Sequence, residues 1–298
     1  MRPELAELVL GDRLRLVLPA YGSFLALGFL LAFVVAIQRR RSLGLGRGEV
    51  FDFGSLTVLV GILGAHLLHV ALNPGRYLAG FDGTLRGLGM TMLRIVLPLE
   101  GGLIYYGGLV GAVVFLLLYS RKRRLGFIDL LDFMAPVGCL GLAVTRVGCF
   151  LNGCCYGRPS SLPWAVSYPP GSLPHVEQRV FGLVGADEAS LPIHPVQLYE
   201  LVVATALFAI LWLWYPRRRF AGEISLAFLC GYAAWRTVAE MLRADGRPVS
   251  GVQFLPPMTR LQLLSVLVLA ASATVFAWRA ARAPRARADS AGPVGDSA

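Results

Sequence analysis

Long apolar runs separated by short basic or glycine- and proline-rich segments dominate the chain. Several of them approach the roughly 20 residues that a helix needs to cross a bilayer. The pattern predicts seven transmembrane helices, at 17–38, 51–72, 101–120, 128–150, 197–215, 220–241 and 261–278. Polar residues interrupt the second helix (Asp52, His66 and His69) and begin the fourth (Asp129 and Asp132). The pattern therefore predicts an all-α integral membrane protein.

Composition excludes an ordinary soluble protein. Of the 298 residues, 56% are hydrophobic and only 15% are charged, whereas soluble domains average about 25% charged residues.

The basic residues predict an orientation. Clusters follow the first, third, fifth and seventh predicted helices, at 39–47, 121–124, 217–219 and 279–287. These are alternate ends of a seven-helix chain, and basic loops stay in the cytoplasm. We therefore expect the N-terminus outside and the C-terminus inside. The net charge of +10 comes largely from these clusters, so it implies no nucleic-acid partner.

One membrane-embedded domain is predicted over 1–278, followed by a basic, disordered cytoplasmic tail over 279–298. The first 16 residues mix acidic and basic side chains and do not resemble a cleaved signal peptide. Outward loops are expected at 73–98, 157–195 and 243–258. The two longest are rich in glycine, proline and aromatic residues, which favours re-entrant or surface-lying segments.

Polar residues cluster at the outward helix ends and predict one polar site there. They are Tyr21, Ser23, Glu100, Tyr105, Tyr106, Arg146, Asn152, His194, Gln197, Tyr199, Glu200, Arg236, Glu240 and Arg243. Arg146 is the most informative, because a charge at membrane depth costs about 2.5 kcal/mol or more and is kept for a partner, a cavity or a ligand. It is our first candidate for holding an anionic substrate.

Spacing supports two parts of this cluster. Arg236, Glu240 and Arg243 share one helical face, so Glu240 can pair with either arginine and leave the other for an anion; a purely structural pair is the alternative. In HPVQLYE the proline can open a helix, which places His194, Gln197 and Glu200 within about a turn. His194 is either a base or a structural hydrogen-bonding residue.

The segment GGLIYYGGLVG, residues 101–111, surrounds two tyrosines with glycines. Such glycines allow close approach to another helix or to a ligand. Tyr106 can donate a hydrogen bond to a phosphate.

The five cysteines fall into two groups. Cys139 and Cys230 lie inside apolar helices and are expected in the core. Cys149, Cys154 and Cys155 lie at the outward interface, where packing, a disulfide and a nucleophilic thiol all stay open. Metal binding is the least favoured, because CCY lacks the usual paired ligand spacing and no histidine lies close in sequence.

These motifs together resemble bacterial prolipoprotein diacylglyceryl transferases, over about residues 16–269. The resemblance includes YGSFLALGFLLA, YYGGLVGA, RVGCFLNGCCYGR, HPVQLYE and WRTVAEMLR. The family signature of an arginine, an asparagine and a glycine is matched by Arg146, Asn152 and Gly157.

The resemblance implies a seven-helix enzyme of the bacterial inner membrane. Its reaction moves diacylglyceryl from phosphatidylglycerol to the lipobox cysteine thiol of exported preprolipoproteins and releases glycerol phosphate, without a metal or organic cofactor. The expected catalytic residues are Arg146, Arg236, Tyr106, His194 and Glu200. The expected substrate-binding residues are Tyr21, Asn152, Gly157, Gln197, Glu240 and Arg243. The expected partners are phosphatidylglycerol, the preprolipoprotein signal peptide that carries the lipobox cysteine, and membrane lipid.

Three positions depart from the family pattern. Tyr106 stands where a histidine is common, Cys149 where an asparagine is common, and Cys154 where an acidic residue is common. The first change removes a candidate base, so His194, Glu200 or Tyr106 is left to take the thiol proton. A lipid-modifying enzyme with another acceptor, and a membrane thiol–disulfide protein using Cys149, Cys154 and Cys155, are the alternatives. A transporter is disfavoured because neither internal repeats nor broken midplane helices are clear.

Overall fold

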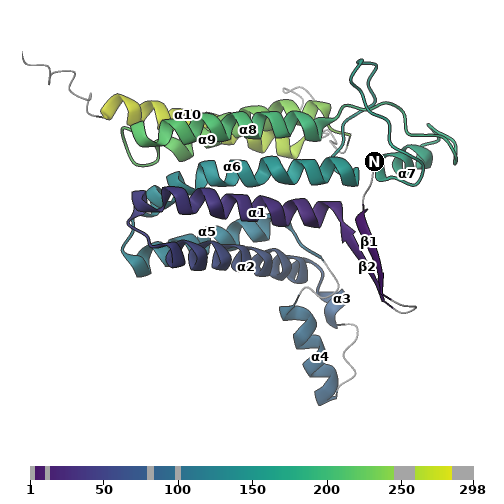
Figure 1. Cartoon of the computed structure of the whole chain (residues 1–298), viewed down its shortest axis with the longest axis horizontal. Coiled ribbons are helices and arrows are strands. Elements are labelled where there is room, and N and C mark those ends of the chain that lie inside the picture. The colour runs from purple at the N-terminus through teal and green to yellow at the C-terminus, as the bar shows by residue number, and fades with distance from the viewer. Residues whose placement is uncertain (1–3, 11–13, 79–83, 98–101, 245–258, 284–298) are drawn as a thin grey trace, which may run out of the picture. The chain divides into compact units, whose positions relative to one another are not determined.

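The computed structural model describes residues 4–10, 14–78, 84–97, 102–244 and 259–283 (Figure 1). The chain forms two compact units. One contains residues 33–131, and the other contains residues 1–32 and 132–298. We describe each unit by itself.

A long helix stands at every segment that the apolar pattern predicted. These helices are α1 (Ala20–Arg39), α2 (Arg47–Leu72), α5 (Tyr105–Arg123), α6 (Phe127–Asn152), α8 (Val196–Trp214), α9 (Glu223–Leu242) and α10 (Arg260–Arg282). In the described part of the chain, five of the seven are long and apolar enough to cross a membrane. The all-α membrane class is confirmed.

The two helices outside that group are α5 and α9. Glycines, two tyrosines and a basic last turn lower the hydropathy of α5, while Arg236 and Glu240 interrupt α9. The predicted count of seven spans, the orientation and the single domain stay predictions.

Several predicted boundaries were wrong by a few residues. Residues 17–19 belong to strand β2 (Leu14–Pro19), which pairs antiparallel with β1 (Glu4–Leu10), so the first helix begins only at Ala20. At the other end, α10 continues to Arg282 and includes the start of the predicted tail. The rest of that tail, 284–298, lies outside the described residues.

In the unit of residues 33–131, α2 and α5 pack along a seam of glycines. A Cβ on Gly64 would lie 2.5 Å from the carbonyl oxygen of Gly107, and one on Gly111 would lie 2.8 Å from that of Val60. Larger side chains would hold the backbones apart. The glycines around the two tyrosines therefore serve, at least here, to pack one helix against another.

Short elements follow α1 and α2 in this unit. They are η1 (Arg40–Leu43), α3 (Pro74–Leu78) and α4 (Leu85–Val96). The ring nitrogens of buried His66 of α2 lie 3.0 and 3.2 Å from the carbonyl oxygens of Arg94 and Gly102. Part of the predicted loop 73–98 is thus helical; residues 79–83 and 98 lie outside the described residues.

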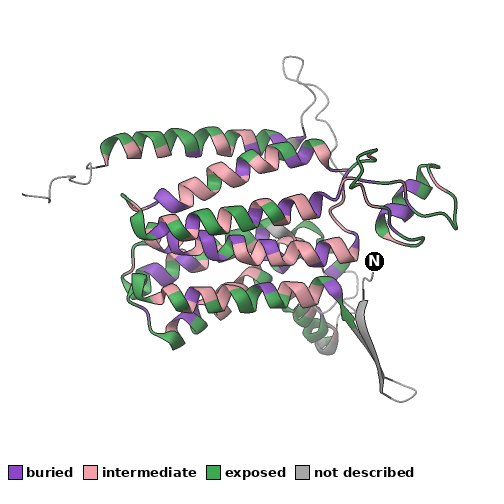
Figure 2. Cartoon of the chain, turned by 45° about the horizontal axis from the view of Figure 1, so that its top comes forward, coloured by how far each residue is buried: buried purple, intermediate pink, exposed green. Residues whose placement is uncertain are grey.

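In the other unit, α6, α8, α9 and α10 each carry both exposed and buried residues (Figure 2). Val202, Leu213 and Leu267 are more than half exposed, whereas Gln197 and Glu200 are buried. A membrane helix shows this distribution because lipid solvates apolar side chains and polar ones need partners inside the bundle.

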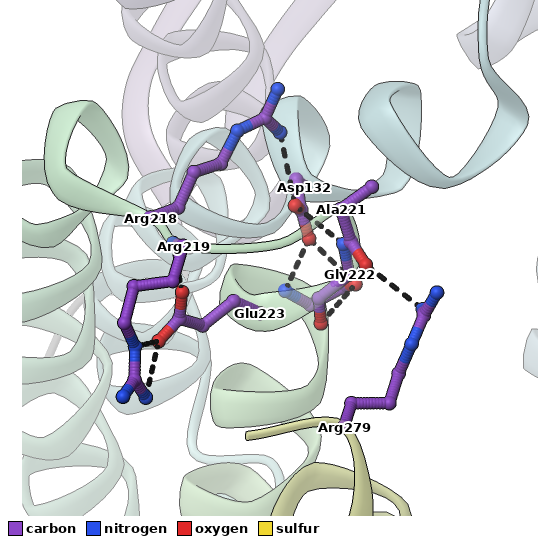
Figure 3. Close-up of polar contacts among 8 residues, drawn as sticks. Asp132, Arg218, Arg219, Ala221, Gly222, Glu223 and Arg279 are labelled. Atoms are coloured by element: carbon purple, nitrogen blue, oxygen red, sulfur yellow. Dashed lines mark hydrogen bonds and ion pairs between the residues drawn. The ribbon is translucent and has the colours of Figure 1, made fainter. Parts of the chain in front are cut away.

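A buried carboxylate, Asp132, joins the first turns of α6 to those of α9 (Figure 3). Its Oδ1 accepts hydrogen bonds from the backbone N–H and the hydroxyl of Ser225, both at 2.8 Å. Its Oδ2 accepts from the backbone N–H of Gly222 at 2.8 Å and from Arg218 at 3.0 Å. The carboxylate satisfies donors at the start of α9 that have no partner within the helix. The polar interruption of the fourth apolar run is therefore a cap for another helix.

At the opposite end of the unit, residues 153–195 form a folded loop. It contains helix α7 (Leu173–Val180), and Ile193 pairs with both Pro159 and Val166. The predicted outward loop 157–195 falls within this connection, and its outward position stays a prediction. Most of the predicted loop 243–258 lies outside the described residues.

Candidate functional site

The signature arginine, Arg146, is held by a carboxylate from another helix. Its Nη2 lies 2.9 Å from Oε1 of Glu200. This ion pair connects the last turns of α6 to the first turns of α8. Glu200 is buried and also accepts a hydrogen bond from the hydroxyl of Tyr232 on α9, at 3.2 Å. Three helices thus fix one guanidinium group, and its Nε has no hydrogen-bond partner among the described residues.

A second ion pair forms within α9. Arg236 pairs with Glu240 one turn further on, and Glu240 also accepts a hydrogen bond from Thr259, the N-cap of α10, at 3.0 Å. The predicted shared face is confirmed for Arg236 and Glu240, which pair with each other. It was wrong for Arg243, because α9 ends at Leu242 and Arg243 continues as extended backbone. The arginine is 18% exposed and its carboxylate 2%, so the positive end of the pair is the more accessible one.

The signature glycine, Gly157, joins the loop to the ends of two other segments. Its backbone N–H donates to the carbonyl oxygen of His194 at 3.1 Å, and it forms an isolated bridge with Arg243. A Cβ at this position would lie 2.6 Å from Cβ of His194 and 2.8 Å from the carbonyl oxygen of Leu242. The contacts admit only a glycine here.

Gln197 and Tyr168 secure the segment after α6. The Gln197 amide donates to the carbonyl oxygen of Cys154 at 2.8 Å, and the Tyr168 hydroxyl donates to that of Phe150 at 3.0 Å. Burial raises the pKa of Tyr168, so its hydroxyl stays a neutral donor. Asn152 is the last residue of α6, directly before this segment.

His194 belongs to a chain of aromatic hydrogen bonds. Its Nδ1 lies 3.4 Å from the hydroxyl of Tyr199, which accepts a hydrogen bond of 2.7 Å from the indole of Trp164. These contacts give His194 a structural role; its role as a base stays a prediction.

Three thiols meet beside Arg146. The sulfur atoms of Cys149, Cys154 and Cys155 all lie within 4.8 Å of one another, and Nη1 of Arg146 lies 3.6 Å from that of Cys149. The pKa of the Cys155 thiol is lowered, because Cys149 and Cys154 donate hydrogen bonds to its sulfur and because Arg243 and Arg146 are positively charged. The spacing CCY gave no sign of this convergence.

Tyr21 and Tyr106 of the predicted site lie in different units. Tyr21, in the first turn of α1, is 40% exposed and close enough to Arg146 and Cys149 to interact with them electrostatically. Tyr106, in the first turn of α5, is 46% exposed and belongs to the unit of residues 33–131. Glu100 lies outside the described residues.

Sequence reasoning missed Tyr232, Thr259 and Tyr168. A signal existed for the first of them, because Tyr232, Arg236 and Glu240 recur every four residues and so share a face of α9. Thr259 and Tyr168 carry no such signal, since their partners are distant in sequence.

Comparison with known proteins identifies the family. Residues 13–278 match the family model for prolipoprotein diacylglyceryl transferase. The chain belongs to this family. The resemblance that the motifs indicated is therefore confirmed.

Individual members of the prolipoprotein diacylglyceryl transferase family agree with this match. A phosphatidylglycerol–prolipoprotein diacylglyceryl transferase of Bordetella bronchiseptica is 36% identical over 230 residues, 75% of this chain and 77% of the relative. One of Nitrosomonas europaea is 31% identical over 263 residues, 87% of this chain and 84% of the relative.

Proposed function

We propose that this protein transfers diacylglyceryl from phosphatidylglycerol to the lipobox cysteine thiol of exported preprolipoproteins and releases glycerol phosphate. Family membership and the names of the relatives support the first step of lipoprotein maturation. The observation that carries the proposal is the placement of the signature arginine, which Glu200 holds at the end of α6.

Both arginine pairs suit a reaction that releases a phosphate. The acceptor thiolate attacks the glycerol carbon, a carbon–sulfur bond forms, and the carbon–oxygen bond to the phosphate breaks. The phosphate gains charge as it leaves, and guanidinium groups that are already oriented stabilise that charge. Arg146 and Arg236 take this role because carboxylates fix both of them.

The remaining predicted residues are proposed to serve the same reaction. Glu200 and Glu240 position the two arginines, and Gly157 keeps the loop close to Arg243. Tyr21, Asn152, Gln197 and Arg243 are proposed to contact the substrates. The proton of the acceptor thiol has three candidate recipients, His194, Glu200 and Tyr106.

We place the protein in the bacterial inner membrane with seven spans, the N-terminus outside and the C-terminus in the cytoplasm. The alternating basic clusters support this arrangement, and it puts the ends of α6, α8 and α9 that carry the site on the outward side, where exported preprolipoproteins are processed.

Glycerol phosphate release tests the function. Purified protein is given phosphatidylglycerol and a lipobox peptide, and Arg146→Ala is compared with Arg123→Ala, which breaks a more exposed arginine–glutamate pair with Glu49. We expect release that requires the peptide thiol, a loss of at least 100-fold in Arg146→Ala, and little change in Arg123→Ala, since a lost charge-assisted contact to a transition state costs about 3 kcal/mol. Full turnover by folded Arg146→Ala would contradict the mechanism.

A further inference from the structure

The three converging thiols form a site that the transferase chemistry described above does not use. Cys149 lies in the last turn of α6 and is buried. Cys154 and Cys155 lie in the segment that follows and are half-buried. All three sulfur atoms lie within 4.8 Å of one another, and all three are free thiols.

The backbone turns these side chains toward one another. Neighbouring residues of an extended chain point in opposite directions, but Gly153 and Cys155 both have a positive φ, of 73° and 59°. A residue other than glycine is uncommon in that region. The backbone N–H of Cys154 donates to the carbonyl oxygen of Cys149 at 3.1 Å, and Gln197 donates to that of Cys154. The segment is therefore fixed with its thiols together.

Three converging thiols have the ligand chemistry of a zinc site. Zinc–thiolate bonds of about 2.3 Å separate the sulfurs of a tetrahedral site by about 3.8 Å. The sulfurs reach that separation by moving about 1 Å at most, which side-chain rotation supplies. Three thiolates around Zn²⁺ leave one net negative charge, and the guanidinium of Arg146 lies 3.6 Å from the sulfur of Cys149 to offset it.

We propose that Cys149, Cys154 and Cys155 bind one zinc ion and that its fourth position takes the acceptor thiol. Zinc sites with three protein ligands keep a position for substrate, and a thiol that coordinates zinc loses its proton. The second half of the proposal rests on the proposed function. It supplies an activated nucleophile, because the thiolate and not the thiol attacks.

The step balances without an oxidant or a reductant. The acceptor thiol binds as a thiolate and its proton passes to solvent. Its sulfur then forms a bond to the glycerol carbon, the carbon–oxygen bond to the phosphate breaks, and the electron pair leaves with the phosphate oxygen. The product is a thioether, a weaker ligand than a thiolate, so it leaves the zinc, which stays Zn²⁺ throughout.

Metal content tests the site without reference to turnover. Protein purified without chelators is analysed for zinc by mass spectrometry, alongside Cys149→Ser, Cys154→Ser and the control Cys230→Ser, whose thiol contacts Ser272 between α9 and α10. We expect about one zinc per chain in the wild type and in Cys230→Ser, and a loss of at least tenfold in the other two. Wild-type protein without zinc that also takes up none when it is added would overturn the proposal.

Thiol titration of the denatured, unreduced wild type separates zinc from a disulfide, and it needs no variant. Five reactive thiols after chelation are expected, matching the five free cysteines. Three reactive thiols would show a disulfide and overturn the zinc site in favour of the thiol–disulfide alternative.

Cobalt replacement tests the open position. Thiolate-to-cobalt absorption of the Co²⁺-loaded wild type should rise by roughly one third when a lipobox peptide adds a fourth thiolate to three. The same peptide with serine for cysteine is the control and should cause no rise. No rise with the cysteine peptide would overturn the role of the fourth position. Glycerol phosphate release by protein stripped of zinc would overturn the role of the fourth position and leave the proposed function intact.

Discussion

At the residue scale, the site is built from charges that neutralise one another. Arg146 and Arg236 each pair with a carboxylate that is almost fully buried. A lone charge at membrane depth is costly, and removing one partner of a buried pair leaves the other uncompensated. The carboxylates therefore stabilise the arginines and also fix the direction in which they meet a phosphate.

Gly157 tests the packing of this site. Gly157→Ala should lower stability by about 1–3 kcal/mol and reduce turnover, because the added Cβ overlaps both His194 and the carbonyl oxygen of Leu242, and overpacked sites relax only at that cost. Thermal unfolding in detergent and glycerol phosphate release are the measurements. Gly138→Ala is the matched control, since a Cβ there meets nothing within 4 Å. Equal stability of the two variants would contradict this account.

At the element scale, contacts between elements distant in sequence hold the helices. Asp132 of α6 caps α9 about 90 residues further along the chain (Figure 3). The glycine seam between α2 and α5 works differently, through close backbone approach. The first contact is a set of directional hydrogen bonds and the second is close steric packing. Each fixes the relative position of two helices, which apolar side chains in contact with lipid would not do by themselves.

Asp132→Asn tests the directional contact. Each carboxylate oxygen of Asp132 accepts two hydrogen bonds. An asparagine would place its NH₂ group at one of these two positions, where it would face donors. We expect a loss of about 1–3 kcal/mol from the unsatisfied buried donors. Thermal unfolding is the measurement, with the exposed Asp187→Asn as control. An unchanged melting temperature for Asp132→Asn would rule out the capping role.

At the scale of the whole molecule, the open question is how many helices cross the membrane. Within the described residues, five helices qualify by length and composition, and α5 and α9 do not. Both alternatives place the C-terminus inside if the N-terminus is outside, so the termini do not distinguish them. The loops between the helices do.

Reporter fusions decide the count. With seven spans, fusions after Arg124 and after Arg218 lie inside and a fusion after Ser160 lies outside; with five spans, all three are reversed. We expect a fluorescent reporter that matures only in the cytoplasm to be active after Arg124 and Arg218, because the basic clusters stay inside. An exported phosphatase is the complementary control, active after Ser160. Phosphatase activity after Arg124 would contradict the seven-span arrangement.

Much of the site was predictable because its signals are local. The four-residue spacing of Arg236 and Glu240 determines a shared helical face, and the cost of Arg146 in an apolar run indicates a partner. The identity of that partner was not predictable, since Glu200 lies on another helix and only packing brings the two together. The same holds for the donors to Asp132, which read in sequence as an interruption of an apolar run.

The sequence by itself determined the membrane class, the positions of the long helices and the family, because apolar periodicity, charge placement and motif order are properties of the chain. Only the tertiary structure decided which carboxylate holds which arginine, why Gly157 has no room for a side chain, and that three cysteines meet at one point. The reason is physical: a helix follows from short-range backbone hydrogen bonds, whereas a site depends on contacts between residues that are distant in sequence, and left-handed turns at Gly153 and Cys155 decide where neighbouring thiols point.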